Sequence, residues 1–185
     1  MQQFEPGCVR TEQKGKGSAE RFLEQIIGLL PRLSAFALCL TGNSEQHDDL
    51  VQATSARALG RRDQWQPGAH LDAWMLRIAL NLWFDRKRAK RFRSEPIDID
   101  YSAGSDARAV TESRLVPADL LTALDKLAPE HRAMIALVCV DDLSYTKAAE
   151  VLSLPVGTVM SRLARARLAL YEAANAAIAS KATRH

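Results

Sequence analysis

Apolar residues recur at three- and four-residue intervals through most of this chain, and this spacing constrains the fold more than any other feature. The clearest run comprises Phe22, Ile26, Leu29, Leu33, Phe36 and Leu40. Such spacing places one apolar stripe along a helix. Only 9 glycines and 7 prolines stand among the 185 residues, so few turns are expected. The sequence therefore predicts an all-α protein.

Membrane-spanning and secreted classes are disfavoured. The longest uninterrupted apolar run, Ala133 to Val140, is far shorter than the roughly 18 residues that a membrane-spanning helix needs. Residues 1–16 lack an apolar segment followed by a cleavage site, so no secretory signal is predicted and a cytoplasmic protein is expected. The cysteines are widely separated, which argues against a disulfide framework or a zinc clip. Cys39 and Cys139 lie in apolar runs and are expected in the core, whereas Cys8 is expected to be an exposed thiol.

Charge is unevenly distributed, although the net charge is only +3. Basic residues dominate 86–93, acidic residues dominate 94–119, and a second basic group follows at Arg162, Arg165 and Arg167. This order indicates two contacts on a polyanion, separated by a connector that the polyanion repels. For any single run, a solvated helix face is the alternative.

Composition also divides the chain into domains. Residues 1–18 lack periodicity and contain several glycines, so a mobile tail is expected there. Residues 94–117 are rich in Ser, Asp, Pro and Gly, as linkers are. We therefore expect a helical domain over 19–93, a flexible linker over 94–117, a second helical domain over 118–177 and a short tail over 178–185.

In the first domain, Pro31 is expected either to kink the first helix or to begin a second one. A helix from about Glu45 to Leu59 follows, with Leu50, Val51, Ala58 and Leu59 facing inward and polar residues outward. Gln66-Pro67-Gly68 predicts a tight turn. The longest helix is expected over 71–92, and its buried stripe comprises Leu71, Met75, Ile78 and Leu82.

The second domain carries the pattern of a helix-turn-helix. A helix over 142–152 is expected with Ser144 as its N-cap, and Ser153-Leu154-Pro155 interrupts it before a further helix begins at Val156. Ala148 and Ala149 are small enough to allow the two helices to approach closely. Hydroxyl and guanidinium groups on the second helix would then face a major groove. An ordinary helical hairpin with an arginine-rich face is the alternative.

Two sets of motifs, in order, resemble one protein family. Residues 48–52 and 73–86 resemble region 2 of the bacterial extracytoplasmic-function (ECF) sigma factors of the sigma-70 family, and residues 124–132 and 143–167 resemble region 4. The resemblance covers about residues 20–173. The residues around Leu30-Pro31, Phe36-Ala37 and Gln66-Pro67-Gly68 are most similar to those of the alphaproteobacterial general-stress branch of this family.

The resemblance implies a transcription initiation factor rather than an enzyme. Region 2 of such proteins binds the clamp helices of the largest RNA polymerase subunit and melts the −10 promoter element. Region 4 binds the −35 element and the flap of the other large subunit. The partners implied are therefore core RNA polymerase, promoter DNA and, because the chain carries no sensor domain, an anti-sigma factor. No cofactor, metal or membrane insertion is implied.

The family's binding residues carry over by position. The polymerase clamp would meet Asp48, Asp49, Gln52 and Arg57. The −10 surface would comprise Trp74, Arg77, Asn81, Asp85, Arg88, Lys90 and Arg91, with residues 66–70 helping to hold an extruded base. The −35 element would meet Thr158, Ser161, Arg162 and Arg165. The chain departs from the family pattern at Ala53, Ser55, Met160 and Ser153; the last stands where a glycine tolerant of positive φ is frequent.

Two other classes of function fit parts of the pattern. One is a repressor or activator that binds duplex DNA without polymerase, and the other is a module whose basic helices bind an acidic protein. An enzyme is disfavoured because the four histidines are scattered and no glycine-rich phosphate loop is present. His47 with Asp48 and Asp49 could imitate an acid–base pair, but a solvated helix face explains them as well.

Overall fold

The computed structural model describes residues 10–66, 68–93 and 118–182, and every regular element within them is a helix. The first half contains α1 (Arg10–Thr41), α2 (Ser44–Gly60), the short 3-10 helix η1 (Arg62–Gln64) and α3 (Leu71–Arg93). The second half contains α4 (Ala118–Asp125), α5 (Pro129–Ile135), the π-helix η3 (Ala136–Val140), α6 (Tyr145–Leu152) and α7 (Val156–Ala182). The all-α prediction is confirmed.

Helix α1 is longer than the sequence suggested. It begins at Arg10, so the part of the expected tail over 10–18 is helical, while residues 1–9 and the linker over 94–117 lie outside the described residues. Glycine weakens a helix by about 1 kcal/mol without the steric clash of proline, so glycines alone need not end one. Pro31 lies inside α1 and does not begin a second helix. The helix ends at Thr41, and the following Gly42 adopts a φ of +66°.

Helices α2 and α3 pack against each other and against the second part of α1. Asn43 caps α2, its side chain accepting a hydrogen bond from the backbone N–H of Gln46 at 3.1 Å. Leu50 and Ala58 are buried as expected, but Leu59 is exposed, because a helix at the edge of the bundle needs only one narrow apolar stripe. The predicted turn before α3 is confirmed by the backbone bond from Ala69 N–H to the carbonyl of Gln66 at 2.9 Å.

The helix-turn-helix in the second half follows its predicted local signals. Ser144 caps α6, its hydroxyl accepting from the N–H of Lys147 at 3.3 Å. Helix α6 begins only at Tyr145, because Asp142 has a φ of +52° and cannot start a right-handed helix. Ser153 ends it with a φ of +54°, the left-handed conformation expected of a position where glycine is frequent. Helix α7 then continues to Ala182, past the expected end of the domain.

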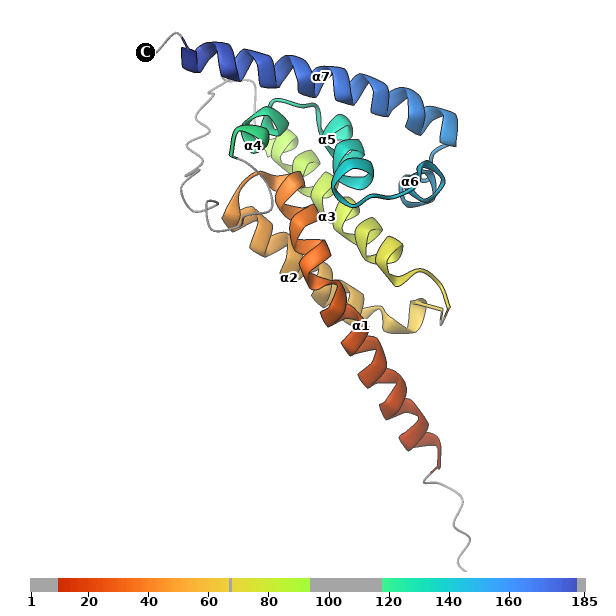
Figure 1. Cartoon of the computed structure of the whole chain (residues 1–185). Coiled ribbons are helices and arrows are strands. Elements are labelled where there is room, and N and C mark those ends of the chain that lie inside the picture. The colour runs from red at the N-terminus through yellow and green to blue at the C-terminus, as the bar shows by residue number, and fades with distance from the viewer. Residues whose placement is uncertain (1–9, 67, 94–117, 183–185) are drawn as a thin grey trace, which may run out of the picture.

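The two halves share one hydrophobic core. Helix α1 contacts α4, α5 and η3, and α3 contacts α6. Figure 1 shows α7 lying across the top of α4, α5 and α6, with α1, α2 and α3 below them and the N-terminal part of α1 extending away from the bundle. The buried side chains therefore form a continuous cluster from Phe22 in α1 to Ala166 in α7.

One segment, Gly17–Thr41, is long and apolar enough to cross a membrane by length and composition, since an 18-residue stretch within it has a mean hydropathy of 1.5. Polar residues interspersed along it keep every uninterrupted apolar run within it short. Its apolar side chains Phe22, Ile26, Leu33 and Phe36 are buried in the protein core. A core helix of a folded bundle has this same composition.

The two described cysteines differ in environment. Cys39 is buried, as predicted, whereas Cys139 is exposed at the edge of η3 and the prediction of a core position is wrong. An apolar run of eight residues wraps all sides of a helix, and only the side that meets neighbouring helices is covered. Burial raises the pKa of the Cys39 thiol to about 11.

We expect iodoacetamide at pH 8 to alkylate Cys139 and to spare Cys39 in the folded protein. Cys139 is accessible, whereas Cys39 is covered and only about 0.1% of a thiol with so high a pKa is ionised at that pH. Peptide mapping by mass spectrometry would measure both. In guanidinium chloride the two sites should react alike, and equal labelling in the native state would contradict the buried position of Cys39.

Candidate nucleic-acid interface

Polar side chains line one face of α3, as the sequence predicted. Arg77, Asn81, Asp85 and Arg88 are all exposed, and the carboxylate of Asp85 lies 3.9 Å from the guanidinium of Arg88. An exposed ion pair of this kind contributes little to stability, so these groups are free to exchange partners. Trp74 differs from them, since it is half-buried and its ring centroid lies 6.4 Å from that of Phe22.

The basic end of α3 presents its cations in more than one direction. Arg88, Lys90 and Arg91 are exposed. Lys87 instead lies 5.7 Å from the centroid of the Trp83 ring, and burial, together with the charge of Arg132, lowers the pKa of its ammonium group. Arg86 donates to the backbone carbonyl of Asp49 in α2 at 3.2 Å. The basic run is therefore divided between outward contacts and internal packing.

The predicted polymerase-facing residues of α2 are all accessible to solvent. Asp48, Asp49, Gln52 and Arg57 are each exposed. His47 beside them is tied into the structure, because its ring nitrogens lie 2.9 Å from Asp48 Oδ1 and 2.8 Å from Ser34 Oγ. This arrangement orients the start of α2 against α1.

The start of α7 carries the predicted groove-facing residues. Ser161 and Arg165 are exposed, whereas Thr158 and Arg162 are half-buried. The Ser161 hydroxyl donates to the carbonyl of Thr158 at 3.1 Å, an internal bond that leaves its lone pairs available. Val159, Leu163 and Ala166 are buried on the opposite side. The helix therefore packs by one stripe and presents hydroxyl and guanidinium groups on the other.

Sequence reasoning missed two arginines that join the halves. Arg32 in α1 forms a bidentate pair with Asp141 and also contacts Asp72 Oδ2 at 3.0 Å. Arg132 in α5 is almost fully buried, donating to the carbonyl of Cys39 at 2.7 Å and to Asp125 at 2.8 Å. Nothing local marks these contacts between the halves, since Asp141 lies 109 residues from Arg32 and Cys39 lies 93 residues from Arg132.

The carboxylates around Arg32 respond to burial in different ways. Burial raises the pKa of Asp141 although the hydrogen bonds from Arg32 act in the opposite direction. For Asp72, burial is outweighed by the N–H of Ala73 and the guanidinium of Arg32, which together hold its pKa below the ordinary value. Asp141 is presented by the π-helix, whose wide turn closes through the bond from Asp141 N–H to Ala136 carbonyl at 3.0 Å.

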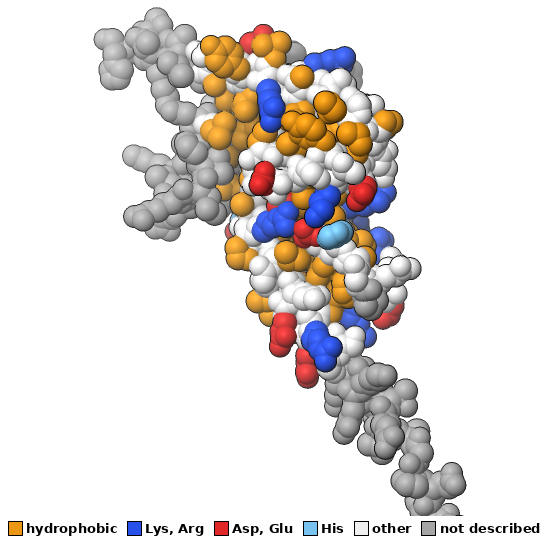
Figure 2. Space-filling model, turned by 45° about the vertical axis from the view of Figure 1, so that its right-hand side comes forward, with side chains coloured by type: hydrophobic (Ala, Val, Ile, Leu, Met, Phe, Trp, Pro, Cys, Tyr) orange, Lys and Arg blue, Asp and Glu red, His pale blue; other side chains and the backbone are white. Residues whose placement is uncertain are grey.

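An apolar groove of about 600 Å³ lies between α4, η3 and α7. Leu120, Leu124, Ile135, Leu170 and Tyr171 line it, with Arg167 and Cys139 at the same site. Figure 2 shows hydrophobic side chains gathered near the top of one face of the molecule, where α7 lies, while basic and acidic side chains mix below them. Within the described residues, no group of three or more His, Cys, Asp or Glu side chains is placed to hold a metal ion.

Two family models match the chain. The model of sigma-70 region 2 matches residues 25–93, and that of sigma-70 region 4 matches residues 118–170. Together they contain α2, α3 and the helix-turn-helix of α6 and α7. The two halves recognised in the sequence are thus matched separately and in the same order.

Similar proteins carry the same family name. The ECF RNA polymerase sigma factor EcfG of Rhodopseudomonas palustris is 38% identical over 144 residues, which cover 78% of this chain and 80% of that protein. The ECF sigma factor SigE of Mycolicibacterium smegmatis is 34% identical over 74% of this chain and 54% of its own length. The solved structure of the sigma factor RpoE with the anti-sigma factor NepR from Bartonella quintana shares 27% identity and a TM-score of 0.65, covering 83% of this chain and 96% of that one. This chain is accordingly a member of the ECF RNA polymerase sigma factors of the sigma-70 family.

Proposed function

We propose that the protein recognises promoters through two separate faces, one on α3 and one at the start of α7. The observation that supports this is the exposure of arginines on both helices, each backed by a buried apolar stripe. The −10 face comprises Trp74, Arg77, Asn81, Asp85, Arg88, Lys90 and Arg91. The −35 face comprises Thr158, Ser161, Arg162 and Arg165. The exposed side of α2, with Asp48, Asp49, Gln52 and Arg57, would bind the polymerase clamp.

The chain is proposed to act without catalysis, cofactor or membrane insertion, in the cytoplasm. Regions 2 and 4 form its two working domains, over 19–93 and 118–177. The groove beside α7 offers apolar side chains and Arg167, which suit an amphipathic helix with an acidic residue. A helix of the polymerase flap is one such ligand. A place in the alphaproteobacterial general-stress branch, which the residues around Leu30-Pro31 and Gln66-Pro67-Gly68 resemble, is part of this proposal.

Purified protein is expected to start transcription only together with core RNA polymerase. Each DNA face alone offers few contacts, and joining both to one large scaffold raises their effective concentration on a promoter. Run-off transcription on a genomic promoter library would measure this. Promoter-specific product should appear with core enzyme plus this protein and not with either alone. Lack of product on every template, with the protein folded, would refute the function, and a footprint without polymerase would favour a simple repressor.

Arg162→Ala and Arg165→Ala are expected to weaken −35 binding in the holoenzyme. If either guanidinium makes a bidentate base contact, its loss should cost roughly 1–3 kcal/mol and relax the preference at that base. Lys90→Ala should instead reduce affinity about equally for all sequences and lower the salt slope. Titrations on promoter variants at several salt concentrations distinguish the two effects. The assignment of Arg162 to base recognition is wrong if its variant changes only the salt slope.

We also propose that an anti-sigma factor controls the protein. The solved RpoE structure contains the anti-sigma factor NepR. The surfaces such an inhibitor would cover are the exposed side of α2 and the segment from Leu137 to Tyr145, where Cys139, Asp142 and Tyr145 are exposed while Leu137 and Leu143 are buried. A pull-down from the native cytoplasm should recover a small helical protein bound one-to-one. That protein should compete with core polymerase. If both bound at once and transcription continued unchanged, this form of control would be refuted.

A further inference from the structure

We propose that the ring of Phe92 inserts at a base step of the promoter duplex beside the −10 element and so anchors the end of α3 on DNA. The inference rests on the proposed promoter-binding function. It adds an apolar contact at a residue outside the proposed −10 face, near the end of α3, where the contacts of that face are otherwise made by charged side chains.

Phe92 is the most exposed large hydrophobic side chain in the described part of the chain, with an exposed fraction of 83%. The aromatic residues of the preceding turns behave differently. Trp83 is buried, Phe84 is half-buried, and their ring centroids lie 5.1 Å apart. Single exposed apolar residues are ordinary on protein surfaces, so exposure alone assigns no role to Phe92. The face on which its ring lies and the charges around it do so.

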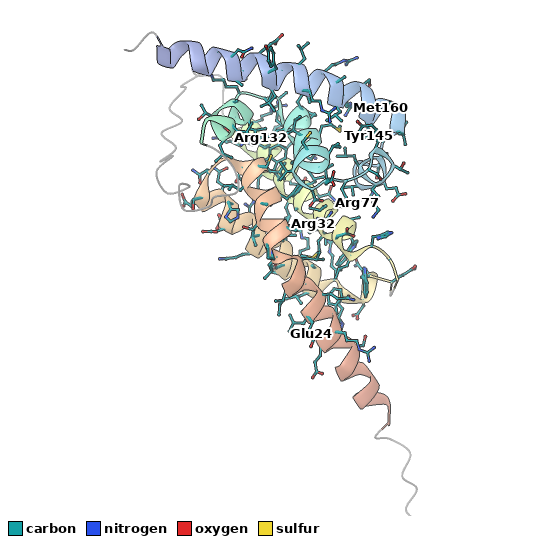
Figure 3. The ribbon with its side chains drawn as sticks, viewed as in Figure 1. Glu24, Arg32, Arg77, Arg132, Tyr145 and Met160 are labelled. Carbon is teal, nitrogen blue, oxygen red and sulfur yellow. The ribbon has the colours of Figure 1, made fainter. Side chains whose placement is uncertain are left out.

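Phe92 continues the polar face of α3. Steps of four, four, three and four residues lead from Arg77 through Asn81, Asp85 and Arg88 to Phe92, and residues at this spacing lie along one side of a helix. All five are exposed. Arg77 is labelled on α3 in Figure 3, nearer the start of the helix. The ring therefore lies on the same side of α3 as the groups assigned to the −10 element.

The position of Phe92 along α3 places it at the end of this face that is remote from the extruded base. Trp74 and Phe92 are 18 residues apart, which is about five helical turns, so both side chains leave the helix on the same side, about 27 Å apart along its axis. Successive bases of B-form DNA are about 3.4 Å apart, and this distance corresponds to about eight base steps. Because residues 66–70, directly before α3, are expected to hold the extruded base, Phe92 would meet DNA whose strands are still paired.

The charges around the ring favour DNA as its partner. Arg88 and Arg91 are exposed on the turn of α3 that carries Phe92, and such cations neutralise phosphates on either side of a base step. The carboxylate of Asp85, two turns before the ring, lies 3.9 Å from the guanidinium of Arg88. Proteins that insert Phe, Leu or Met between base steps combine this apolar insertion with basic contacts to the backbone, and they kink the duplex. The end of α3 has both parts.

Phe92→Ala should weaken promoter binding by the holoenzyme at least about fivefold, the lower limit of what base–aromatic stacking contributes. The probe is a promoter fragment selected by the run-off experiment, with its −10 segment left unpaired so that melting does not contribute to the affinity. Phe92→Leu should keep much of the affinity, because leucine also inserts at base steps. Ile27→Ala is the matched control and should bind as wild type does, since Ile27 is an apolar residue of the same domain that is 55% exposed on α1.

Two further measurements identify the contact. The slope of log affinity against log salt concentration should be unchanged in Phe92→Ala, because the ring carries no charge, whereas Arg91→Ala should lower it by about one. The fluorescent base 2-aminopurine, whose emission rises when it loses stacking with its neighbours, can be placed at successive positions of the paired DNA that flanks the unpaired segment. Wild-type holoenzyme should raise the emission at one or two adjacent positions, and Phe92→Ala holoenzyme should not.

Circular dichroism first verifies that each variant is helical. The proposal is overturned if Phe92→Ala binds and unstacks the probe as wild type does. It is also overturned if Phe92→Ala weakens binding to core polymerase without DNA, which would make the ring part of a protein interface, or if the loss appears only when the flanking DNA is single-stranded. Absence of promoter-specific transcription by the wild-type holoenzyme would instead refute the proposed function, and this contact with it.

Discussion

Phe36→Ala is expected to lower the free energy of unfolding by about 3–5 kcal/mol. The Phe36 ring is fully buried in α1, in the part of the core that both halves share. Its truncation removes apolar burial and leaves a cavity that rigid helices on several sides cannot close. Because a domain is stable by only about 5–15 kcal/mol, much of the total would be lost.

Urea denaturation followed by circular dichroism would measure this change. Ile27→Ala is the matched control, since Ile27 lies on the same helix with its side chain 55% exposed, and it should change stability by about 0.5 kcal/mol or less. A similar loss in both variants would show that Phe36 is not a core residue.

Arg132→Ala is expected to cost about 2–4 kcal/mol of stability, which is a large effect for a charged residue. Arg132 is 1% exposed and donates to the carbonyl of Cys39, one of the last carbonyls of α1, which have no partner within the helix. A cation at a helix C-terminus also interacts favourably with the helix dipole. Asp125, its other partner, is half-exposed and can be solvated after the change, so the cost comes mainly from the carbonyl and the lost packing.

Arg132→Lys should recover only part of this stability, because an ammonium group cannot occupy both positions of the guanidinium fork. Arg21→Ala is the exposed control and should be nearly neutral. The same urea titration serves all three variants. The Arg132 guanidinium packs closely against Gly42, where a Cβ would collide with its Nη2. If Arg132→Ala matched the control, the role of Arg132 as the cap of α1 would be wrong.

The sequence by itself determined the local structure, that is, the helices, their caps and their exposed faces. Apolar periodicity located the helices. The N-cap of α6 at Ser144 and the left-handed residue Ser153 after it could also be read from the sequence, since each depends on neighbours within four residues. The exposed arginines of α3 and α7 followed from the same periodicity, because a helix that buries one stripe must present the opposite one. The sequence motifs of both halves then identified the family, and the two family models confirm it.

Only the tertiary structure decided what each stripe packs against. Cys139 and Leu59 were both expected to face the core yet are exposed, while the charged Arg132 is buried. Helix α1 also begins before the expected start of the first domain, and α7 ends after the expected end of the second. Arg32 meets Asp141 across 109 residues of chain, and Arg77 meets Ser153 across 76. Periodicity determines which face of a helix is apolar, but burial and ion pairing depend on contacts between segments distant in sequence, and these exist only once the helices pack together.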